Sequence, residues 1–396
     1  MEKQHLVEPD LEFIAQVMKQ GGDSFKNCYQ CATCSVVCSL SPDNRPFPRK
    51  EMLAVSWGLK ARLLADPDIW LCHQCGDCSA RCPRGAAPGD VLAAVRSCVI
   101  SEYATPRFWA KAVNDPGKLP WLIALPVLIF LVPGLLTGLL DFTPSGDAVV
   151  HSKFFSTWLV DMIFVPLAAA MLISFGASLR KFLNDMHRNA VMEKRTDDAD
   201  IDFTGFFRAL IRTLPGIFRH DNFSKCSENR ERAVSHLMVF FGFGGLFITT
   251  VVIFILLYVF QIHGPFSQLN PLKWLANIAG VLLITGAVLM IKKRLSQADR
   301  KTVYGDWYLI GLVSGLGISG MLTEITRLAN AAGLSYSLYI VHLVFVFHLI
   351  AFLPCSKFAH IAYRTVAMAY TRYIQEKEIG EPENQPDTPV FSRSGH

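Results

Sequence analysis

The chain has 396 residues, of which 51% are apolar and 18% charged, and its mean hydropathy is positive. This length accommodates two or three domains, and the apolar excess is typical of membrane proteins. The formal net charge is only +5, and no basic cluster is interleaved with exposed aromatic residues. Nucleic acid is therefore excluded as the expected partner, and the positive charges are interpreted by their position relative to membrane spans.

Eight of the eleven cysteines form two runs with the same internal spacing. The first run is Cys28, Cys31, Cys34 and Cys38, and the second is Cys72, Cys75, Cys78 and Cys82. Each run supplies the ligand count of a [4Fe–4S] cluster, and in ferredoxins with this spacing the fourth cysteine of a run binds the other cluster. Crossed ligation is therefore expected. One cluster would be bound by Cys28, Cys31, Cys34 and Cys82, and the other by Cys72, Cys75, Cys78 and Cys38.

Structural zinc, disulfides and inert thiols are competing interpretations that explain less of this pattern. Zinc sites use pairs of Cys-x2-Cys knuckles, so two cysteines of each run would be surplus. Disulfides need an oxidising compartment, whereas the chain opens with MEKQHLVEPD, which lacks the apolar core of a secretion signal. One departure from the ferredoxin pattern is that Pro83 follows the second run but Ser39 follows the first. The other cysteines are expected to be ordinary buried thiols, namely Cys98, Cys226 and Cys355.

Residues 1 to about 105 are predicted to form a small helical ferredoxin domain, because the segments between the cysteines show helical periodicity. Pro9-Asp10 opens a first helix, which ends at Gly21-Gly22. A single helix is predicted from Pro48 to Leu64, and another begins at Gly89-Asp90. The expected fold class is all-α.

Six runs are long and apolar enough to cross a bilayer core of about 30 Å, which takes roughly 20 helical residues. They cover approximately residues 121–140, 158–179, 236–260, 274–291, 307–329 and 338–353, and the last is expected to continue to residue 360. Residues 106–375 are thus predicted to form a transmembrane, cytochrome b-like helical bundle. Residues 376–396 are predicted to form a polar, disordered tail.

The basic residues between the spans predict an orientation. Residues 180–232 contain eleven Lys and Arg and residues 292–301 contain five, whereas the other loops contain almost none. By the positive-inside rule these two loops face the cytoplasm, and an even number of spans returns both termini to the same side. The protein is therefore expected in the cytoplasmic (inner) membrane, with the cysteine domain in a reducing compartment.

The cytoplasmic loop of residues 180–233 contains an amphipathic stripe. Apolar side chains recur at three- and four-residue spacing from Phe203 to Phe218, with Arg208, Arg212 and Arg219 elsewhere on the helical wheel. A helix of this kind beside membrane spans is expected to lie on the inner leaflet. A docking face for a soluble partner is the alternative.

Histidines at matching depths indicate haem b inside the predicted bundle. His236 begins the third span and His360 ends the sixth, both on the cytoplasmic side, and a bis-histidine haem is predicted between them. On one uninterrupted helix His342 would lie five turns from His360, about 27 Å away and on the same face. A second haem at His342 would need a partner from the outer side. His263 is the nearest candidate and His151 is a second option.

Ionisable residues at membrane depth are functional candidates, because burying them is costly. The candidates for a quinone site are Lys273, Glu324 and Arg327. Glu324 and Arg327 are three residues apart on one helix, so mutual neutralisation is the alternative interpretation. His348 lies six residues after His342 and is expected to face away from the haem, where it would pack or form hydrogen bonds.

Both halves together resemble the family of membrane-bound C subunits found in quinone-interacting membrane-bound oxidoreductase (Qmo) complexes. The segments NCYQCATCSVVC and LCHQCGDCSARCP are similar to the C subunit of heterodisulfide reductase. The segments YIVHLVFVFHLIAFLPCSKFAH, which contains His342 and His360, and ITGAVLMIKKRL resemble the gamma subunit of respiratory nitrate reductase. In the nitrate reductase protein, the equivalent of the third span carries two histidines ten residues apart. Here His236 matches the first, and Leu246 occupies the second position.

This resemblance implies an electron-transfer subunit that oxidises menaquinol and passes electrons through haem b and two [4Fe–4S] clusters. The implied partners are flavin- and iron–sulfur-containing proteins like the A subunit of heterodisulfide reductase, and adenylylsulfate reductase of sulfate respiration. The alternative enzyme is a heterodisulfide-reductase-like C/E fusion that couples a quinone or methanophenazine pool to thiol–disulfide chemistry. A non-catalytic alternative is a cluster-bearing redox sensor or membrane anchor.

Overall fold

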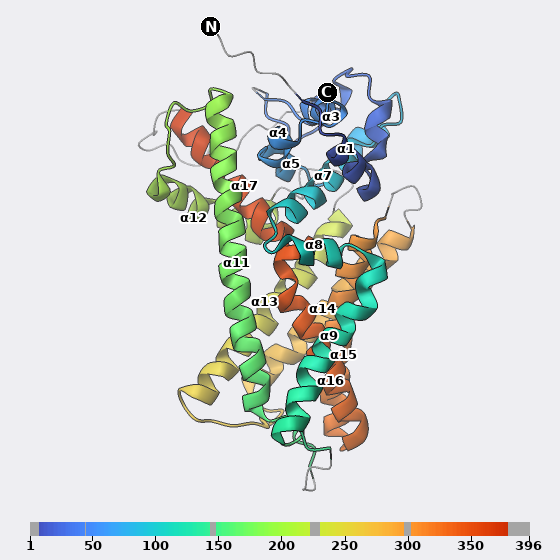
Figure 1. Cartoon of the computed structure of the whole chain (residues 1–396), viewed down its shortest axis with the longest axis vertical. Helices are drawn as coiled ribbons and strands as arrows, with labels where there is room; N and C mark the ends of the chain where they lie inside the picture. The colour runs from blue at the N-terminus through green and yellow to red at the C-terminus, as the bar shows by residue number, and fades with distance from the viewer. Residues whose placement is uncertain (1–7, 44, 143–147, 222–229, 297–301, 379–396) are drawn as a thin grey trace.

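The computed structural model describes residues 8–43, 45–142, 148–221, 230–296 and 302–378 (Figure 1). Within these ranges the regular secondary structure is helical apart from one β-bridge between Leu140 and Phe155, which confirms the all-α class. A unit of short helices lies at one end of a bundle of long ones (Figure 1). The predictions for Cys226 and for the tail beyond residue 378 fall outside the described residues.

The N-terminal unit is built from short helices and one longer helix. They are α1 (Leu11–Val17), α2 (Thr33–Val36), α3 (Arg49–Ser56), α4 (Lys60–Leu64), α5 (Asp68–Leu71), α6 (Asp77–Ala80) and α7 (Pro88–Tyr103), with a π-turn at Met18–Gly22 and a 3-10 turn at Asp23–Asn27. Asp10 caps α1, since its Oδ1 accepts a hydrogen bond from the N–H of Phe13 at 2.8 Å. The segment that begins with α1 ends near Gly21, which has a φ of 85°. Both ends lie where the sequence predicts them.

The prediction of a single helix from Pro48 to Leu64 is wrong. The chain forms two helices there, α3 and α4, separated at Gly58, whose φ of 64° is a left-handed conformation that other residues rarely adopt. The carbonyl of Gly58 accepts a hydrogen bond from the N–H of Asp10 at 3.0 Å, and a Cβ at Gly58 would approach that nitrogen to 2.8 Å. The break therefore allows the start of α1 to pack closely against this segment.

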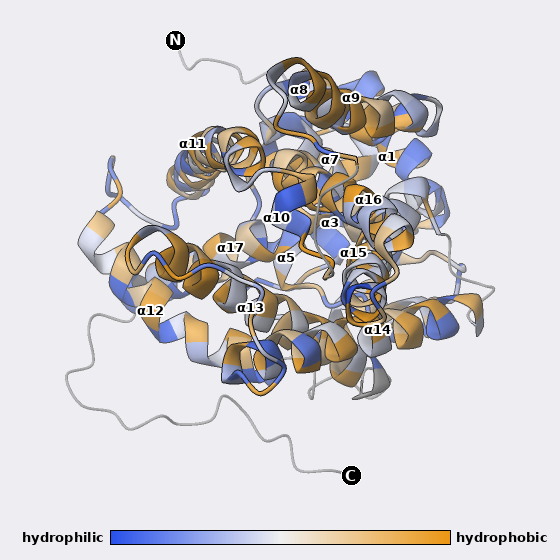
Figure 2. Cartoon of the chain, turned by 90° about the horizontal axis from the view of Figure 1, so that it is seen from below, coloured by the Kyte–Doolittle hydropathy of each residue, from blue (hydrophilic) through white to orange (hydrophobic). Residues whose placement is uncertain are grey.

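Six described helices are long and apolar enough to cross a membrane. They are α9 (Leu119–Thr137), α11 (Thr157–Met192), α13 (Arg230–Tyr258), α14 (Pro271–Ser296), α15 (Tyr304–Leu328) and α16 (Ala332–Ala351). The connecting elements are α8 (Arg107–Val113), α10 (His151–Phe154) and the 3-10 turns Pro116–Lys118, Leu353–Cys355 and Lys357–Ala359. Hydrophobic residues predominate on the bundle helices (Figure 2). The structure thus supports a multi-pass membrane protein.

The helix α11 continues beyond the predicted end of its span at residue 179 and reaches Met192. It runs the length of the bundle and continues beside the N-terminal unit (Figure 1). Phe182, Leu183 and Met186 on this extension are buried in the same hydrophobic cluster as the core of the N-terminal unit. The first part of the predicted cytoplasmic loop is therefore a helical extension of this span, and it packs against the cysteine-rich unit.

The predicted amphipathic segment forms α12 (Phe203–Arg219). Asp202 caps it, because its two carboxylate oxygens accept hydrogen bonds from the N–H groups of Thr204 and Gly205 at 3.0 Å. The helix packs against α17 (His360–Glu378), and part of its apolar stripe is buried there. The exposed apolar residues are Phe203, Phe207, Ile211 and Phe218. Binding of this exposed half to the inner leaflet stays a prediction.

The predicted continuation of the last span to His360 is wrong. The span helix α16 ends at Ala351, two 3-10 turns follow, and His360 is the first residue of α17. Pro354 interrupts the helix, because proline has no N–H to donate and its ring crowds the preceding turn. His342 and His360 therefore lie on different helices, and the spacing that assumed one continuous helix does not apply.

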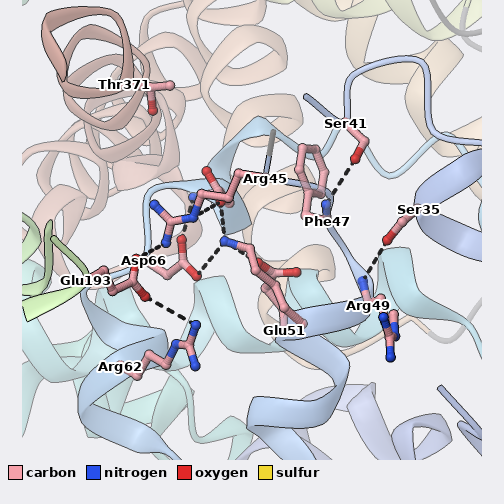
Figure 3. Close-up of polar contacts among 12 residues, drawn as sticks. Ser35, Ser41, Arg45, Phe47, Arg49, Glu51, Arg62, Asp66, Glu193 and Thr371 are labelled. Carbon is pink, nitrogen blue, oxygen red and sulfur yellow. Dashed lines mark hydrogen bonds and ion pairs between the residues drawn. The ribbon is translucent and has the colours of Figure 1, made fainter. Parts of the chain in front are cut away.

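Three buried carboxylates, those of Glu51, Asp66 and Asp68, surround the ammonium of Lys50 (Figure 3). Lys50 Nζ lies 3.1 Å from an oxygen of Glu51 and 3.5 Å from one of Asp66, and it also pairs with Asp68. Burial and the Asp66 carboxylate raise the pKa of Glu51 to about 8. The ammonium thus occupies the position that a bound cation would otherwise take, and the group is a charge-neutralising network.

The same network ties the N-terminal unit to α11 (Figure 3). Arg45 lies 3.5 Å from Asp68 and also pairs with Glu193, which directly follows α11. Arg62 reaches the other carboxylate oxygen of Glu193 at 3.2 Å. Two arginines of the cysteine-rich unit therefore fix the C-terminal end of this long helix.

We expect Glu51→Gln to remove a pH-dependent loss of stability. The folded state raises the pKa of Glu51 from 4.5 to about 8, so the stability that its proton contributes is present below pH 4.5 and is lost as the pH rises through about 8. Between pH 6 and 8 the wild type should lose up to about 1.4 kcal/mol per pH unit relative to the variant. Thermal unfolding of the solubilised full chain measures this difference, and parallel pH profiles for the two proteins would contradict it.

Candidate metal centres

The cysteines of the two runs line two separate pockets. The first pocket contains Cys28, Cys31, Cys34 and Cys82, and the second contains Cys38, Cys72, Cys75 and Cys78. In each pocket three cysteines come from one run and the fourth comes from the other. This is the grouping that crossed ligation requires.

The backbone of both runs has the same sequence of conformations. The second and fourth residues after the first cysteine have positive φ in each run: Gln30 and Ala32 in the first, with φ of 59° and 68°, and Gln74 and Gly76 in the second, with φ of 50° and 102°. A short helix follows each of these turns, α2 in the first run and α6 in the second. These repeated left-handed residues wrap the first three cysteines of each run around one pocket. The equal spacing of the two runs thus corresponds to an equal local backbone conformation.

The two pockets differ in their exposure. Cys31 is exposed in the first pocket, and the neighbouring side chains of Tyr29 and Val36 are 68% and 76% exposed. In the second pocket Cys78 is buried, and burial raises the pKa of its thiol to about 12 and that of Cys38 to about 11. Buried thiols of this kind carry a charge only when a metal is bound to them. Burial also raises the pKa of Cys34 in the first pocket to about 11, so the two pockets differ mainly at Cys31, which is exposed, and Cys78, which is buried.

Two of the predicted haem ligands lie together at the end of the bundle that faces the N-terminal unit. The rings of His236 on α13 and His360 on α17 have centroids 6.4 Å apart, with an interplanar angle of 74°. Nδ1 of His236 lies 2.8 Å from Nε2 of His220, and Nδ1 of His360 lies 2.6 Å from the carbonyl oxygen of Lys357. Metal-binding histidines characteristically use their second nitrogen in such a hydrogen bond, which leaves Nε2 as the ligand atom.

The spacing of these rings fits a single metal between them. Imidazole nitrogens bind metals at about 2 Å, so two rings on opposite sides of one ion have centroids roughly 6 Å apart. The observed 6.4 Å agrees with that arrangement. The sequence did not indicate His220, which lies just after α12 with no periodicity to single it out. Its position sixteen residues before His236 carries no recognisable signal.

The predicted outer histidines are not all brought together. His342 is held by Ser319, whose Oγ lies 3.0 Å from its Nδ1. His263 is exposed, and no contact with His342 is found among the described residues. By contrast, Nε2 of His151 lies 2.9 Å from Oγ of Ser335, which is on the same helix as His342. His151 therefore lies against the helix that carries His342, although the described part of the chain shows no direct contact between the two histidines.

The three candidates for a quinone site form one ion-paired group. Glu324 binds Arg327 through both carboxylate oxygens, at 2.8 and 3.0 Å, and Lys273 Nζ lies 2.9 Å from the same residue. The mutual neutralisation of Glu324 and Arg327 is thus present, with Lys273 as a second cation. His348 is hydrogen-bonded as expected, since its nitrogens lie 2.9 Å from the hydroxyl of Tyr308 and 3.1 Å from a backbone carbonyl.

Comparisons with known proteins bear on the cysteine-rich unit. Residues 24–86 match the family described as 4Fe-4S dicluster domain. The C subunit of the H(2):CoB-CoM heterodisulfide,ferredoxin reductase of Methanothermobacter marburgensis is 36% identical over 112 residues, which is 28% of this chain and 57% of the relative. A protein of Archaeoglobus profundus that is named for its likeness to the C subunit of heterodisulfide reductase is 33% identical over 93 residues, or 23% and 50% of the two chains.

A relative of a second kind also matches. The E subunit of the dihydromethanophenazine:CoB--CoM heterodisulfide reductase of Methanosarcina thermophila is 32% identical over 149 residues, which is 33% of this chain and 54% of the relative. The chain spans about half the length of the curated relatives it matches. No solved structure matches the chain. The N-terminal region therefore resembles the C and E subunits of heterodisulfide reductases, and its 4Fe-4S dicluster domain indicates iron–sulfur electron transfer.

Replacing Cys82, the fourth cysteine of the second run, tests which of the two clusters this residue binds. In Cys82→Ser we expect the electron paramagnetic resonance signal of the cluster held by Cys28, Cys31 and Cys34 to change, because Cys82 lines that pocket. The signal of the other cluster should persist. Cys98→Ser is the matched control, since Cys98 is buried on α7 and lines neither pocket. An effect confined to the cluster of the second run would contradict crossed ligation.

Proposed function

We propose that this protein is the membrane electron-transfer subunit of a quinone-linked oxidoreductase. Menaquinol is oxidised in the transmembrane domain of residues 106–375, and its electrons pass through haem b to two [4Fe–4S] clusters in the domain of residues 1–105. Soluble flavin- and iron–sulfur-containing subunits then accept them. The protein lies in the cytoplasmic membrane with both termini and the clusters on the cytoplasmic side.

The observation that carries this proposal is the pairing of His236 with His360 beside the cysteine-rich unit. Their ring spacing fits one metal ion, and both Nδ1 atoms are engaged in the hydrogen bonds typical of metal-binding imidazoles. His220 and the carbonyl of Lys357 would fix the orientation of the two rings. A haem bound there supplies a one-electron relay between the bundle and the clusters.

The outer side of the bundle is the proposed position of quinone chemistry. The carboxylate of Glu324 between Lys273 and Arg327 forms a polar group at the end of an apolar bundle, where a quinone headgroup could form hydrogen bonds. A second haem at His342 would take its other ligand from His151 in preference to His263, since the former lies against the same helix.

The resemblance to the C subunits of Qmo complexes supports adenylylsulfate reductase as the final partner, in sulfate respiration. The nitrate-reductase-gamma-like pattern of the last spans supports the haem. The relatives matched above are heterodisulfide reductase subunits, so we infer these partners and the quinone type from the resemblance alone.

A second candidate function follows from those relatives. A heterodisulfide-reductase-like C/E fusion would couple a quinone or methanophenazine pool to thiol–disulfide chemistry through its partner subunits. The matches to both a C and an E subunit favour this alternative. Both functions use the same clusters and membrane domain, so the substrate distinguishes them.

Haem content tests the ligand assignment. His360→Ala should lose the haem b absorbance and the protohaem measured in the purified wild type, because one of the two histidines that would hold the haem is missing. His348→Gln is the control, since His348 is hydrogen-bonded to Tyr308 and to a backbone carbonyl. Non-haem iron should stay at about eight atoms per chain in both variants, as two [4Fe–4S] clusters require. Unchanged haem bands in His360→Ala would refute the assignment.

The electron donor separates the two candidate functions. In the assembled complex, a reduced menaquinol analogue should reduce the haem within the turnover time, because the proposed path starts in the membrane. A thiol–disulfide substrate alone should not. Optical spectra at the haem α-band measure both reactions, and haem reduction by the thiol substrate with no response to the quinol would favour the C/E-like function.

A further inference from the structure

Two arginines from outside the N-terminal unit, one on the span helix α13 and one on α17, bind the loop that carries the second cysteine run. Arg232 of α13 donates a hydrogen bond to the carbonyl of Gln74 at 2.6 Å. Arg364 of α17 donates to the carbonyl of Leu71 at 3.4 Å and to Nε2 of His73, which must accept because a guanidinium only donates. The backbone on both sides of Cys72 is therefore held by side chains from outside the N-terminal unit.

The positions of these arginines relate them to the paired histidines. Arg232 lies four residues before His236, and Arg364 lies four residues after His360. On an α-helix four residues make about one turn, so each arginine lies next to the histidine of its own helix and toward the cysteine-rich unit. Each of the two helices thus presents one histidine to the other helix and one arginine to the cysteine loop.

A third arginine completes the set from within the N-terminal unit. Arg96 of α7 donates to the carbonyl of Ile69 at 2.7 Å and to that of Cys72 at 3.3 Å. The loop is therefore fixed by its own domain and by the two histidine-bearing helices together. The first pocket, in contrast, opens to solvent at Cys31.

We propose that Arg232 and Arg364 are the positioning residues of an electron-transfer junction between the membrane bundle and the cysteine-rich unit. They hold the second pocket, lined by Cys38, Cys72, Cys75 and Cys78, against the His236–His360 pair. The second pocket thereby exchanges electrons with the bundle, and the first pocket exchanges them with the soluble partner. This inference rests on the proposed function.

One electron crosses the junction in each step. The centre held by the histidines loses one electron and the centre held by the cysteines gains it, while no proton or group is transferred. The added negative charge arises beside two guanidinium groups, which stabilise it electrostatically. The arginines thus fix the distance between the two centres and also favour the reduced state of the nearer cluster.

The test uses the purified full chain with Arg232→Gln, Arg364→Gln and the double substitution. Arg372→Gln is the matched control, because Arg372 lies on the same helix two turns further on and binds Glu376 and the carbonyl of Arg212. After a pulse of reduced quinol analogue, haem reduction should be as fast as in the wild type. Reoxidation of that haem by the clusters should slow at least tenfold in the double variant and be unchanged in the control.

A redox titration followed by electron paramagnetic resonance gives a second readout that needs no haem. In the double variant the cluster of the second pocket should become about tenfold harder to reduce, a shift of 59 mV for one electron. The cluster of the first pocket should not shift. Lysine at both positions keeps the charge but replaces the planar guanidinium that makes these contacts with a point-like ammonium on a flexible stem, so it should restore the potential and leave the transfer slow.

The outcomes separate the junction from the proposed function. If the wild type binds no haem, or if its haem does not respond to quinol, the proposed function fails, and the titration still tests the arginines. Wild-type transfer rates and potentials in a double variant with full iron content would overturn the junction. If the glutamine variants lose their iron, the lysine variants provide the test. Electron transfer at the wild-type rate in the lysine variants would then overturn the positioning role of the arginines.

Discussion

A buried aromatic contact between Trp70 and Tyr363 joins the cysteine-rich unit to the membrane bundle. The two rings stack at a centroid distance of 5.5 Å and an interplanar angle of 12°, and Phe182 of α11 packs edge-on against both. Trp70 lies two residues before Cys72, and Tyr363 lies three residues after His360. This contact therefore packs the segment before the second cysteine run against the helix that begins at His360, and the arginine contacts on which the proposed electron path depends lie beside it.

Hydrophobic burial holds this interface more than its ion pairs do. Each fully buried aromatic side chain removes 150–250 Å² from water, which at about 25 cal/mol per Å² amounts to roughly 4–6 kcal/mol before entropy is counted. A buried ion-pair network such as that of Lys50 with its three carboxylates contributes little net stability, because desolvation offsets the attraction. Breaking it would nonetheless be costly, since unpaired charges would stay buried. The aromatic rings thus supply the stability of the interface, and the charged groups fix its orientation.

Much of the fold and of the site follows from local spacing alone. The repeated cysteine pattern predicts two pockets and the exchange of the fourth cysteine, because both depend on short segments with the same conformations. Apolar runs predict the six long helices for a similar reason. The breaks near Gly58 and Pro354 are not predicted, because apolar periodicity continues across them and outweighs the local signals of the glycine and the proline. His220, Arg232 and Arg364 are missed as well, since basic residues in loops and at helix ends beside membrane spans are common.

The break near Pro354 explains how the chain places His360, nine residues after the end of the last membrane helix, beside a cysteine loop. A continuous helix would carry His360 straight out of the bundle along the axis of α16. Because the helix ends at Ala351, α17 starts afresh at His360 and runs beneath the N-terminal unit, where Tyr363 and Arg364 reach α5 and the loop that follows it. The break that the spacing did not predict therefore allows α17 alone to contribute a candidate haem ligand, the stacking tyrosine and one arginine of the junction.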